Sequence, residues 1–190
     1  MHLRSRGAEK AAVVETSGSW DMSPETEDAV TIAPLEAQDI SAARDLLERY
    51  IRSLDRDLSF QHVDEELRDF PRKYSEPEGS FFLAKAGAQP CACAGLRRID
   101  KGTCEIKRLY VSDRFRGRGI GRGLVEYAIA AARAKGYRLM RLDTLEDMKT
   151  AQDLYRSLGF YEIAPYTVNP LAGTLFMEKR LIDDSGEPRA

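Results

Sequence analysis

Glycine and arginine are concentrated in one short segment of the chain. Between Leu109 and Gly123 the sequence holds four glycines and four arginines, and an amphipathic run follows them. Where a strand enters a helix through such a loop, the first backbone N–H groups of the helix lack partners, and glycine lets an anion approach them closely. The segment therefore predicts a binding site for a phosphate or a pyrophosphate.

Two named phosphate-binding patterns do not match this segment. The Walker pattern needs Gly-Lys followed by Ser or Thr, which the chain lacks. The dinucleotide pattern G-x-G-x-x-G would need a third glycine where Arg122 or Leu124 stands. The pattern R-x-x-G-x-G remains, and it is met by Arg116, Gly119 and Gly121.

A second block of possible chemistry lies further along the chain. It reads Ala-x-x-Leu-Tyr-x-x-Leu-Gly-Phe over residues 151–160, and its apolar members repeat at helical spacing. Tyr155 lies on this apolar stripe. Taken alone, that position predicts an aromatic residue of the core rather than a reactive one.

Charge and composition exclude several classes of protein. The 190 residues include 29 Lys and Arg against 31 Asp and Glu, a net charge of −2, so no broad positive charge favours nucleic acid or an anionic membrane. No apolar run approaches the roughly 18 residues of a membrane span or forms a signal-peptide core. The three cysteines and two histidines match neither a zinc framework nor a redox pair. We therefore expect a cytoplasmic protein with no metal, nucleic-acid or membrane partner.

Hydrophobic periodicity divides the chain into three parts. Residues 1–28 predict a disordered leader, residues 29–182 one folded domain, and residues 183–190 a flexible tail. The order of strand-like and helical periods predicts an α+β fold, a mixed sheet with helices on both faces, in which three consecutive strands form an antiparallel meander. The expected strands cover 29–32, 81–86, 91–99, 104–111, 139–143, 160–163 and 174–181, and the expected helices begin near 40, 63, 119 and 151.

The two blocks together resemble the GNAT superfamily of acetyl-CoA-dependent N-acetyltransferases. The resemblance rests on Leu-Tyr-Val at 109–111, Arg-Gly-Arg-Gly-Ile-Gly at 116–121 and the block at 151–160, and it covers about residues 29–182. It implies the GNAT acyltransferase fold, acetyl-CoA as co-substrate, and direct attack by a primary amine of a small molecule, such as an amino acid. A non-catalytic acyl-CoA-binding module and a nucleotide-binding regulator are the alternatives, and the chain could be a monomer or a homodimer.

The resemblance also implies roles for particular residues. Tyr155 is similar to the tyrosine that protonates the departing thiolate, and Glu105, on the strand before the loop, is the candidate base. Met148 stands where the family commonly has Asn. The pantetheine of coenzyme A is expected along the strand that ends at Val111, in a gap where the sheet splays before Leu139. Contacts with coenzyme A are expected from Leu109, Tyr110, Val111, Arg116, Gly117, Arg118, Gly119, Ile120, Gly121 and Arg122.

Charged residues near this strand are candidates for contact with the acceptor. Glu105 and Lys107 share one face of the strand, with Arg108 on the other face unless a bulge shifts the alternation. Together they would offer a carboxylate to an amine and an ammonium to an acid, which suits an amino acid better than a polyamine. Asp143 would favour a basic acceptor instead, and a solvated surface pair is the alternative for Glu105 and Lys107. Further candidates for substrate contact, where turn chemistry alone is the alternative, are Tyr166 and Asn169.

Overall fold

The computed structural model describes residues 12–14, 29–54, 56, 63–75, 77 and 79–182. The tail expected at 183–190 and most of the leader expected at 1–28 lie outside the described residues. None of the helices in the described ranges is long and apolar enough to cross a membrane.

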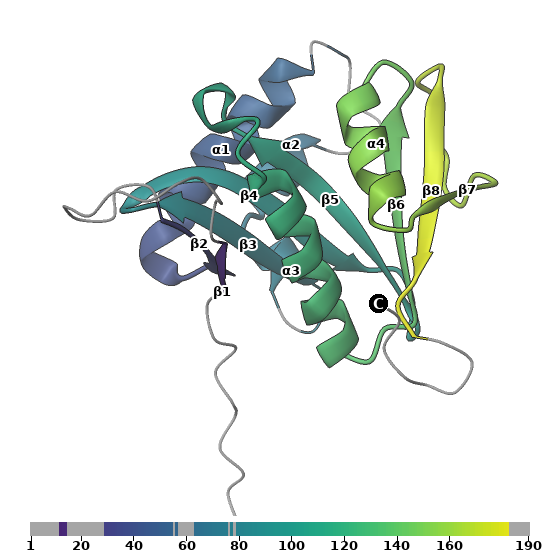
Figure 1. Ribbon diagram of the computed structural model, residues 1–190, viewed down its shortest axis with the longest axis horizontal. Coiled ribbons are helices and arrows are strands. Elements are labelled where there is room, and N and C mark those ends of the chain that lie inside the picture. Colours follow the sequence, from purple (N-terminus) through teal and green to yellow (C-terminus); the bar gives the residue numbers. More distant parts are fainter. Residues whose placement is uncertain are drawn as a thin grey trace, which may run out of the picture.

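One mixed sheet of eight strands organises the described part of the chain (Figure 1). Its spatial order is β1-β2-β3-β4-β5-β6-β8-β7. Neighbouring strands are antiparallel, except that β5 and β6 run parallel, and β3, β4 and β5 form the expected meander. The strands are β1 (Ala12–Val14), β2 (Val30–Pro34), β3 (Gly79–Ala86), β4 (Gln89–Arg98), β5 (Thr103–Val111), β6 (Leu139–Leu145), β7 (Tyr161–Ile163) and β8 (Thr174–Arg180).

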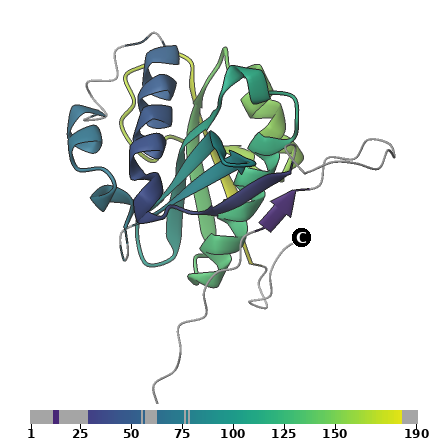
Figure 2. The same ribbon diagram turned by 90° about the vertical axis from the view of Figure 1, so that its left-hand side faces the viewer.

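Helices cover both faces of the sheet, as the sequence predicts. Figure 2 shows α1 and α2, in blue, on one side and α3 and α4, in green, on the other. Because side chains alternate along a strand, Phe81 of β3 packs with Leu47 of α1, whereas the next residue, Phe82, lies in the core that contains Leu124 of α3. The helices are α1 (Ile40–Ser53), α2 (Val63–Arg68), α3 (Ile120–Ala134) and α4 (Lys149–Ser157), with short 3₁₀ turns η1 (Ala37–Asp39), η3 (Arg72–Tyr74) and η4 (Asp113–Phe115).

The sheet opens between β5 and β6. Backbone pairing of these strands runs from Thr103 opposite Leu139 to Glu105 opposite Arg141. Beyond that point the two strands diverge toward their C-terminal ends (Figure 1), while β6 continues to pair with β8. The gap therefore lies after Arg141, not before Leu139 as the resemblance implied.

β5 also contains a bulge. Gly95 of β4 pairs with Lys107 and Cys93 pairs with Tyr110, so the stretch between them holds two residues on β5 and one on β4. Arg108, in this stretch, has a φ of 58°, which is uncommon for any residue other than glycine. The bulge shifts the alternation of side chains, and Arg108 turns toward α2.

A short strand lies within the segment expected to be disordered. β1 pairs antiparallel with β2, with Val13 opposite Thr31. A strand at the edge of a sheet leaves one row of backbone N–H and C=O groups open, and a segment rich in β-branched residues can pair with that row. At residues 12–14 the structure thus differs from the predicted disordered leader.

Candidate active site

A groove of about 910 Å³ follows the opening between β5 and β6. The end of β5, the glycine-rich loop with the first turn of α3, and the start of α4 form its walls. All the residues predicted to contact coenzyme A line it except Arg118, namely Leu109, Tyr110, Val111, Arg116, Gly117, Gly119, Ile120, Gly121 and Arg122. The structure therefore brings the predicted cofactor residues together along one groove.

Two glycines of the loop have backbone conformations that favour glycine. Gly117 has a φ of 77° and Gly119, the residue that precedes the first turn of α3, has a φ of 78°. A Cβ atom at either position would meet nothing within 4 Å, so the space in front of the helix is open. No side chain of the described residues caps α3, which leaves its first N–H groups available to an anion.

The arginines of the loop already have partners within the protein. Arg116 Nη2 lies 2.8 Å from Asp113 Oδ1. Arg122 Nη2 donates to Ser157 Oγ at 2.7 Å. Arg118 packs beside an aromatic ring and does not line the groove. The backbone of the loop and helix is therefore the more preorganised part of this anion site.

A smaller cavity of about 80 Å³ adjoins the groove, with which it shares Leu109 and Met148. The charged residues that line it, among those described, are Lys107, Arg108 and Asp143. Tyr155 and Asn169 also line it. The predicted acid thus lies beside three of the predicted substrate residues, next to the predicted cofactor groove.

Tyr155 belongs to both the core and the cavity wall. Its exposed fraction is 7%, and its ring centre lies 5.7 Å from that of Phe160. Burial, together with the nearby Tyr50 and Asp143, raises the pKa of its hydroxyl above the usual value of 10.0. The hydroxyl therefore stays protonated at neutral pH and can act as a donor.

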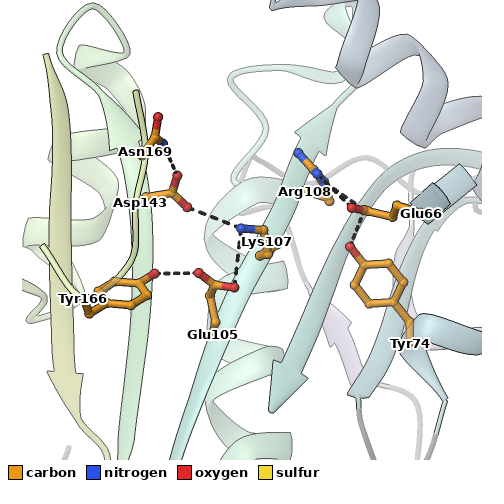
Figure 3. Close-up of polar contacts among 8 residues, drawn as sticks. All are labelled: Glu66, Tyr74, Glu105, Lys107, Arg108, Asp143, Tyr166 and Asn169. Carbon is orange, nitrogen blue, oxygen red and sulfur yellow. Dashed lines mark hydrogen bonds and ion pairs between the residues drawn. The ribbon is translucent and has the colours of Figure 1, made fainter. Parts of the chain in front are cut away.

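Polar contacts join the loop between β7 and β8 to β5 and β6 (Figure 3). Lys107 Nζ lies 3.4 Å from Glu105 Oε2 and 3.6 Å from Asp143 Oδ1. The Tyr166 hydroxyl donates to Glu105 Oε1 at 2.6 Å, and Asn169 Nδ2 donates to Asp143 Oδ2 at 2.8 Å. The four predicted substrate residues and the predicted base therefore form one network, in which two carboxylates flank a single ammonium.

Within this network, Glu105 does not line the cavity. Its exposed fraction is 7%, and both of its oxygens face partners, one from Tyr166 and one from Lys107. Asp143 is the carboxylate of the network that reaches the cavity.

A buried ion pair that the sequence does not reveal lies beside the network (Figure 3). Arg108 donates from Nε and Nη2 to the two oxygens of Glu66 at 2.9 and 2.8 Å, and both side chains are 3% exposed. Burial alone would lower the pKa of Arg108 and raise that of Glu66, but their mutual hydrogen bonds and opposite charges reverse both shifts. Tyr74 donates a further hydrogen bond to Glu66 at 2.5 Å. The one available signal was an arginine within a predicted strand.

Met148 lies where the groove and the cavity meet. It lines both and is the residue that precedes the first turn of α4, where no side-chain hydrogen bond caps the helix. Within the described ranges, no group of three or more His, Cys, Asp and Glu side chains is placed to hold a metal ion.

Known proteins are similar to this chain in sequence and in fold. The model of the Acetyltransferase (GNAT) family matches residues 44–160. An uncharacterised N-acetyltransferase of Schizosaccharomyces pombe is 36% identical over 142 residues, which cover 74% of this chain and 87% of that protein.

Solved structures share the fold. The structure of an acetyltransferase from Streptococcus agalactiae has a TM-score of 0.67 at 23% identity, and the match covers 80% of this chain and 98% of that chain. A GNAT family acetyltransferase from Elizabethkingia anophelis, solved with acetyl-CoA bound, has a TM-score of 0.56 at 23% identity, with the same two coverages. The predicted fold is thus confirmed, and the chain belongs to the GNAT family of acetyltransferases.

Proposed function

We propose that this enzyme transfers the acetyl group of acetyl-CoA to a primary amine of a small molecule, with amino acids among the candidate acceptors. The observation that carries the proposal is the groove at the open end of β5 and β6, which joins a glycine-rich anion site to a cavity lined by Tyr155 and Asp143. The acetyl-CoA bound to the structurally similar enzyme from Elizabethkingia anophelis supports the choice of co-substrate.

Coenzyme A would lie along the groove. Its pyrophosphate would accept hydrogen bonds from the backbone N–H groups between Arg116 and Gly121, at the positive end of α3. Its pantetheine would follow the backbone of β5 at Leu109 and Val111, in the gap that β6 leaves. This placement brings the thioester toward the smaller cavity and Tyr155.

The acceptor amine must lose a proton before it attacks. An alkyl ammonium has a pKa of about 10 and is mostly charged at neutral pH, so a base is required. We assign this role to the carboxylates that flank Lys107. Asp143 would hold the amine directly because it lines the cavity, and Glu105 would act through Lys107.

The remaining steps need a donor for the oxyanion and a proton for the leaving group. The amine nitrogen forms a bond to the carbonyl carbon, and a backbone N–H near Val111 stabilises the negative oxygen. The carbon–sulfur bond then breaks, and the thiolate takes a proton from the Tyr155 hydroxyl. The product nitrogen loses its extra proton, which restores that hydroxyl. The products are an N-acetylated amine and free coenzyme A.

A turnover assay tests the proposal. The full chain is incubated with acetyl-CoA and a panel of amino acids, polyamines and aryl amines, and free thiol and acetylated product are measured together. Equimolar release of both products, with 1:1 binding of acetyl-CoA by calorimetry, is expected. Acetyl-CoA binding without product from any amine would indicate a binding module, and preference for NAD over coenzyme A would indicate a nucleotide-binding regulator.

A further inference from the structure

We propose that Arg108 binds the carboxylate of the acceptor, which makes the acceptor a neutral amino acid whose amine is held by Asp143. This inference rests on the proposed function, because it names the substrate class of the same site. It assigns the recognition of the carboxylate to Arg108 rather than to Lys107, the residue that the sequence suggested.

Arg108 is a buried cation on the wall of the acceptor cavity. Its exposed fraction is 5%, and the bulge of β5 directs it to the same region as Lys107. Guanidinium is planar, so a carboxylate that binds Nε and Nη2 leaves Nη1 on the opposite side. Glu66 binds in this way. Neither of these two hydrogen bonds uses Nη1, and Tyr50 on the cavity wall is a further side chain in hydrogen-bond contact with the guanidinium. In Figure 3 one guanidinium nitrogen points away from Glu66, toward the side where Asp143 lies.

The surroundings hold this guanidinium in a fixed orientation. Glu66 binds it through two hydrogen bonds and is itself fixed by the Tyr74 hydroxyl. The ring of Tyr50, which also lines the cavity, has its centre 6.0 Å from Arg108 Cζ. A preorganised guanidinium with one nitrogen outside the Glu66 pair, at a cavity wall, can recognise a carboxylate without further ordering of the side chain.

Lys107 is less suited to this role. Its ammonium already lies between Glu105 and Asp143, at 3.4 and 3.6 Å, so a third carboxylate beside it would be repelled by both. Asp143 can instead pair with the acceptor ammonium. Arg108 and Asp143 thus offer complementary charges to the two ends of an amino acid.

The other lining residues limit the acceptor side chain. The remaining wall includes Leu145, Met148 and Leu171, and the described lining holds no charged side chain beyond Lys107, Arg108 and Asp143. A second carboxylate or ammonium on the acceptor would therefore lack a partner, which favours neutral amino acids.

The test compares kcat/KM for the best neutral amino acid and for its carboxamide. The amine of the carboxamide is less basic, so a larger fraction of it is unprotonated at neutral pH. For this reason the acid-to-amide ratio of each variant is compared with that of the wild type, and the ratio of one protein alone is not interpreted. The decisive variant is Arg108→Met combined with Glu66→Gln, which removes the pair without leaving a buried charge. A matched control, Lys85→Met with Asp39→Asn, removes an ion pair outside the cavity.

We expect the Arg108 double variant to lower the acid-to-amide ratio at least tenfold while the calorimetric Kd for acetyl-CoA is unchanged, and the control to keep the wild-type ratio. Glu66→Gln alone frees Arg108 of its compensating charge and should lower KM for the acid but not for the amide. If the double variant fails to fold, Arg108→Lys replaces it, because lysine keeps the charge but loses the planar arrangement of donors.

Three results would overturn the inference. First, the double variant could keep the wild-type acid-to-amide ratio. Second, Lys107→Met could be the variant that lowers this ratio. Third, the wild type could acetylate amines that lack a carboxylate and reject amino acids. Each leaves acetyl transfer intact and so spares the proposed function. Failure to bind acetyl-CoA, or to acetylate any acceptor, would overturn the proposed function together with the inference.

Discussion

Tyr155 can serve packing and chemistry at once because its ring and its hydroxyl have different neighbours. The ring packs in the core with Phe160, and the side chain also lines the acceptor cavity. Tyr155→Phe keeps the ring and removes only the hydroxyl. We expect the variant to bind acetyl-CoA with unchanged affinity and to lose turnover by roughly 10²- to 10⁴-fold, the range of a lost general acid. Calorimetry and kcat under saturating substrates measure the two quantities separately, and wild-type turnover would restrict Tyr155 to packing.

Met148 gives a second test with a single residue. It occupies the position before the first turn of α4, where the first backbone N–H groups have no side-chain acceptor. Asparagine can accept a hydrogen bond from those groups, so Met148→Asn should raise the free energy of unfolding by about 1 kcal/mol. Urea denaturation measures the change, with Met148→Leu as the control that keeps an apolar side chain. A decrease in stability would mean that packing of the thioether in the cavity wall outweighs the missing cap.

At the scale of elements, the unit from β5 through the loop to α3 forms the proposed anion site. Gly121 is the better position to test it because a Cβ there would make ordinary contacts, 3.6 Å from Val111 and 3.7 Å from Leu154, whereas Gly119 has positive φ. Gly121→Asp places a negative charge in the first turn of α3, which favours the helix itself but repels pyrophosphate. We expect a folded protein that no longer binds acetyl-CoA.

The control for this prediction is Gly121→Ala, which adds the Cβ atom without the charge. The alanine variant should keep most of the affinity, and circular dichroism should confirm that both variants are folded. An aspartate variant with wild-type affinity by calorimetry would remove the pyrophosphate from this loop.

This unit could be predicted from the sequence because its signals are local. An apolar run, alternating glycines and a helical stripe follow one another without a break, so neighbouring residues determine the strand, the loop and the helix. The meander follows in the same way from short turns between strand-like runs. Tyr155 was predicted with the help of the family resemblance, since its helical stripe alone indicates only core packing.

The pair of Arg108 and Glu66 could not be predicted because it depends on distant partners. The two residues are 42 positions apart in the sequence, and the bulge that turns Arg108 arises from pairing between β4 and β5. The point at which β5 and β6 separate depends likewise on which strands pair beyond Arg141. A single sequence shows the residue types in such sites, but not which of them meet.

At the scale of the whole molecule, β5 connects the two sides of the proposed active site. Residues of β5 line the proposed cofactor groove, and Glu105 of β5 binds Tyr166 in the loop between β7 and β8. On its other side, Arg108 ties β5 to α2 through Glu66. A change in the charge of Glu66 should therefore affect the stability of the fold as well as the acceptor site.

The dependence of stability on pH tests this connection. Burial would raise the pKa of Glu66, but Arg108 and Tyr74 outweigh burial and lower it below the usual 4.5. In acid, the unfolded chain therefore binds more protons at this residue than the native protein does. The contribution of Glu66 to stability is complete above about pH 4.5 and is lost as pH falls through the lowered pKa, at up to about 1.4 kcal/mol per pH unit.

Glu66→Gln should be less stable than wild type at neutral pH, and its free energy of unfolding should fall less steeply in acid. Urea denaturation from pH 7 to pH 3 measures both slopes, with the exposed Glu126→Gln as control. Parallel curves for wild type and Glu66→Gln would mean that the pKa of Glu66 is the same in the native protein and in the unfolded chain, so that folding does not favour its charged form.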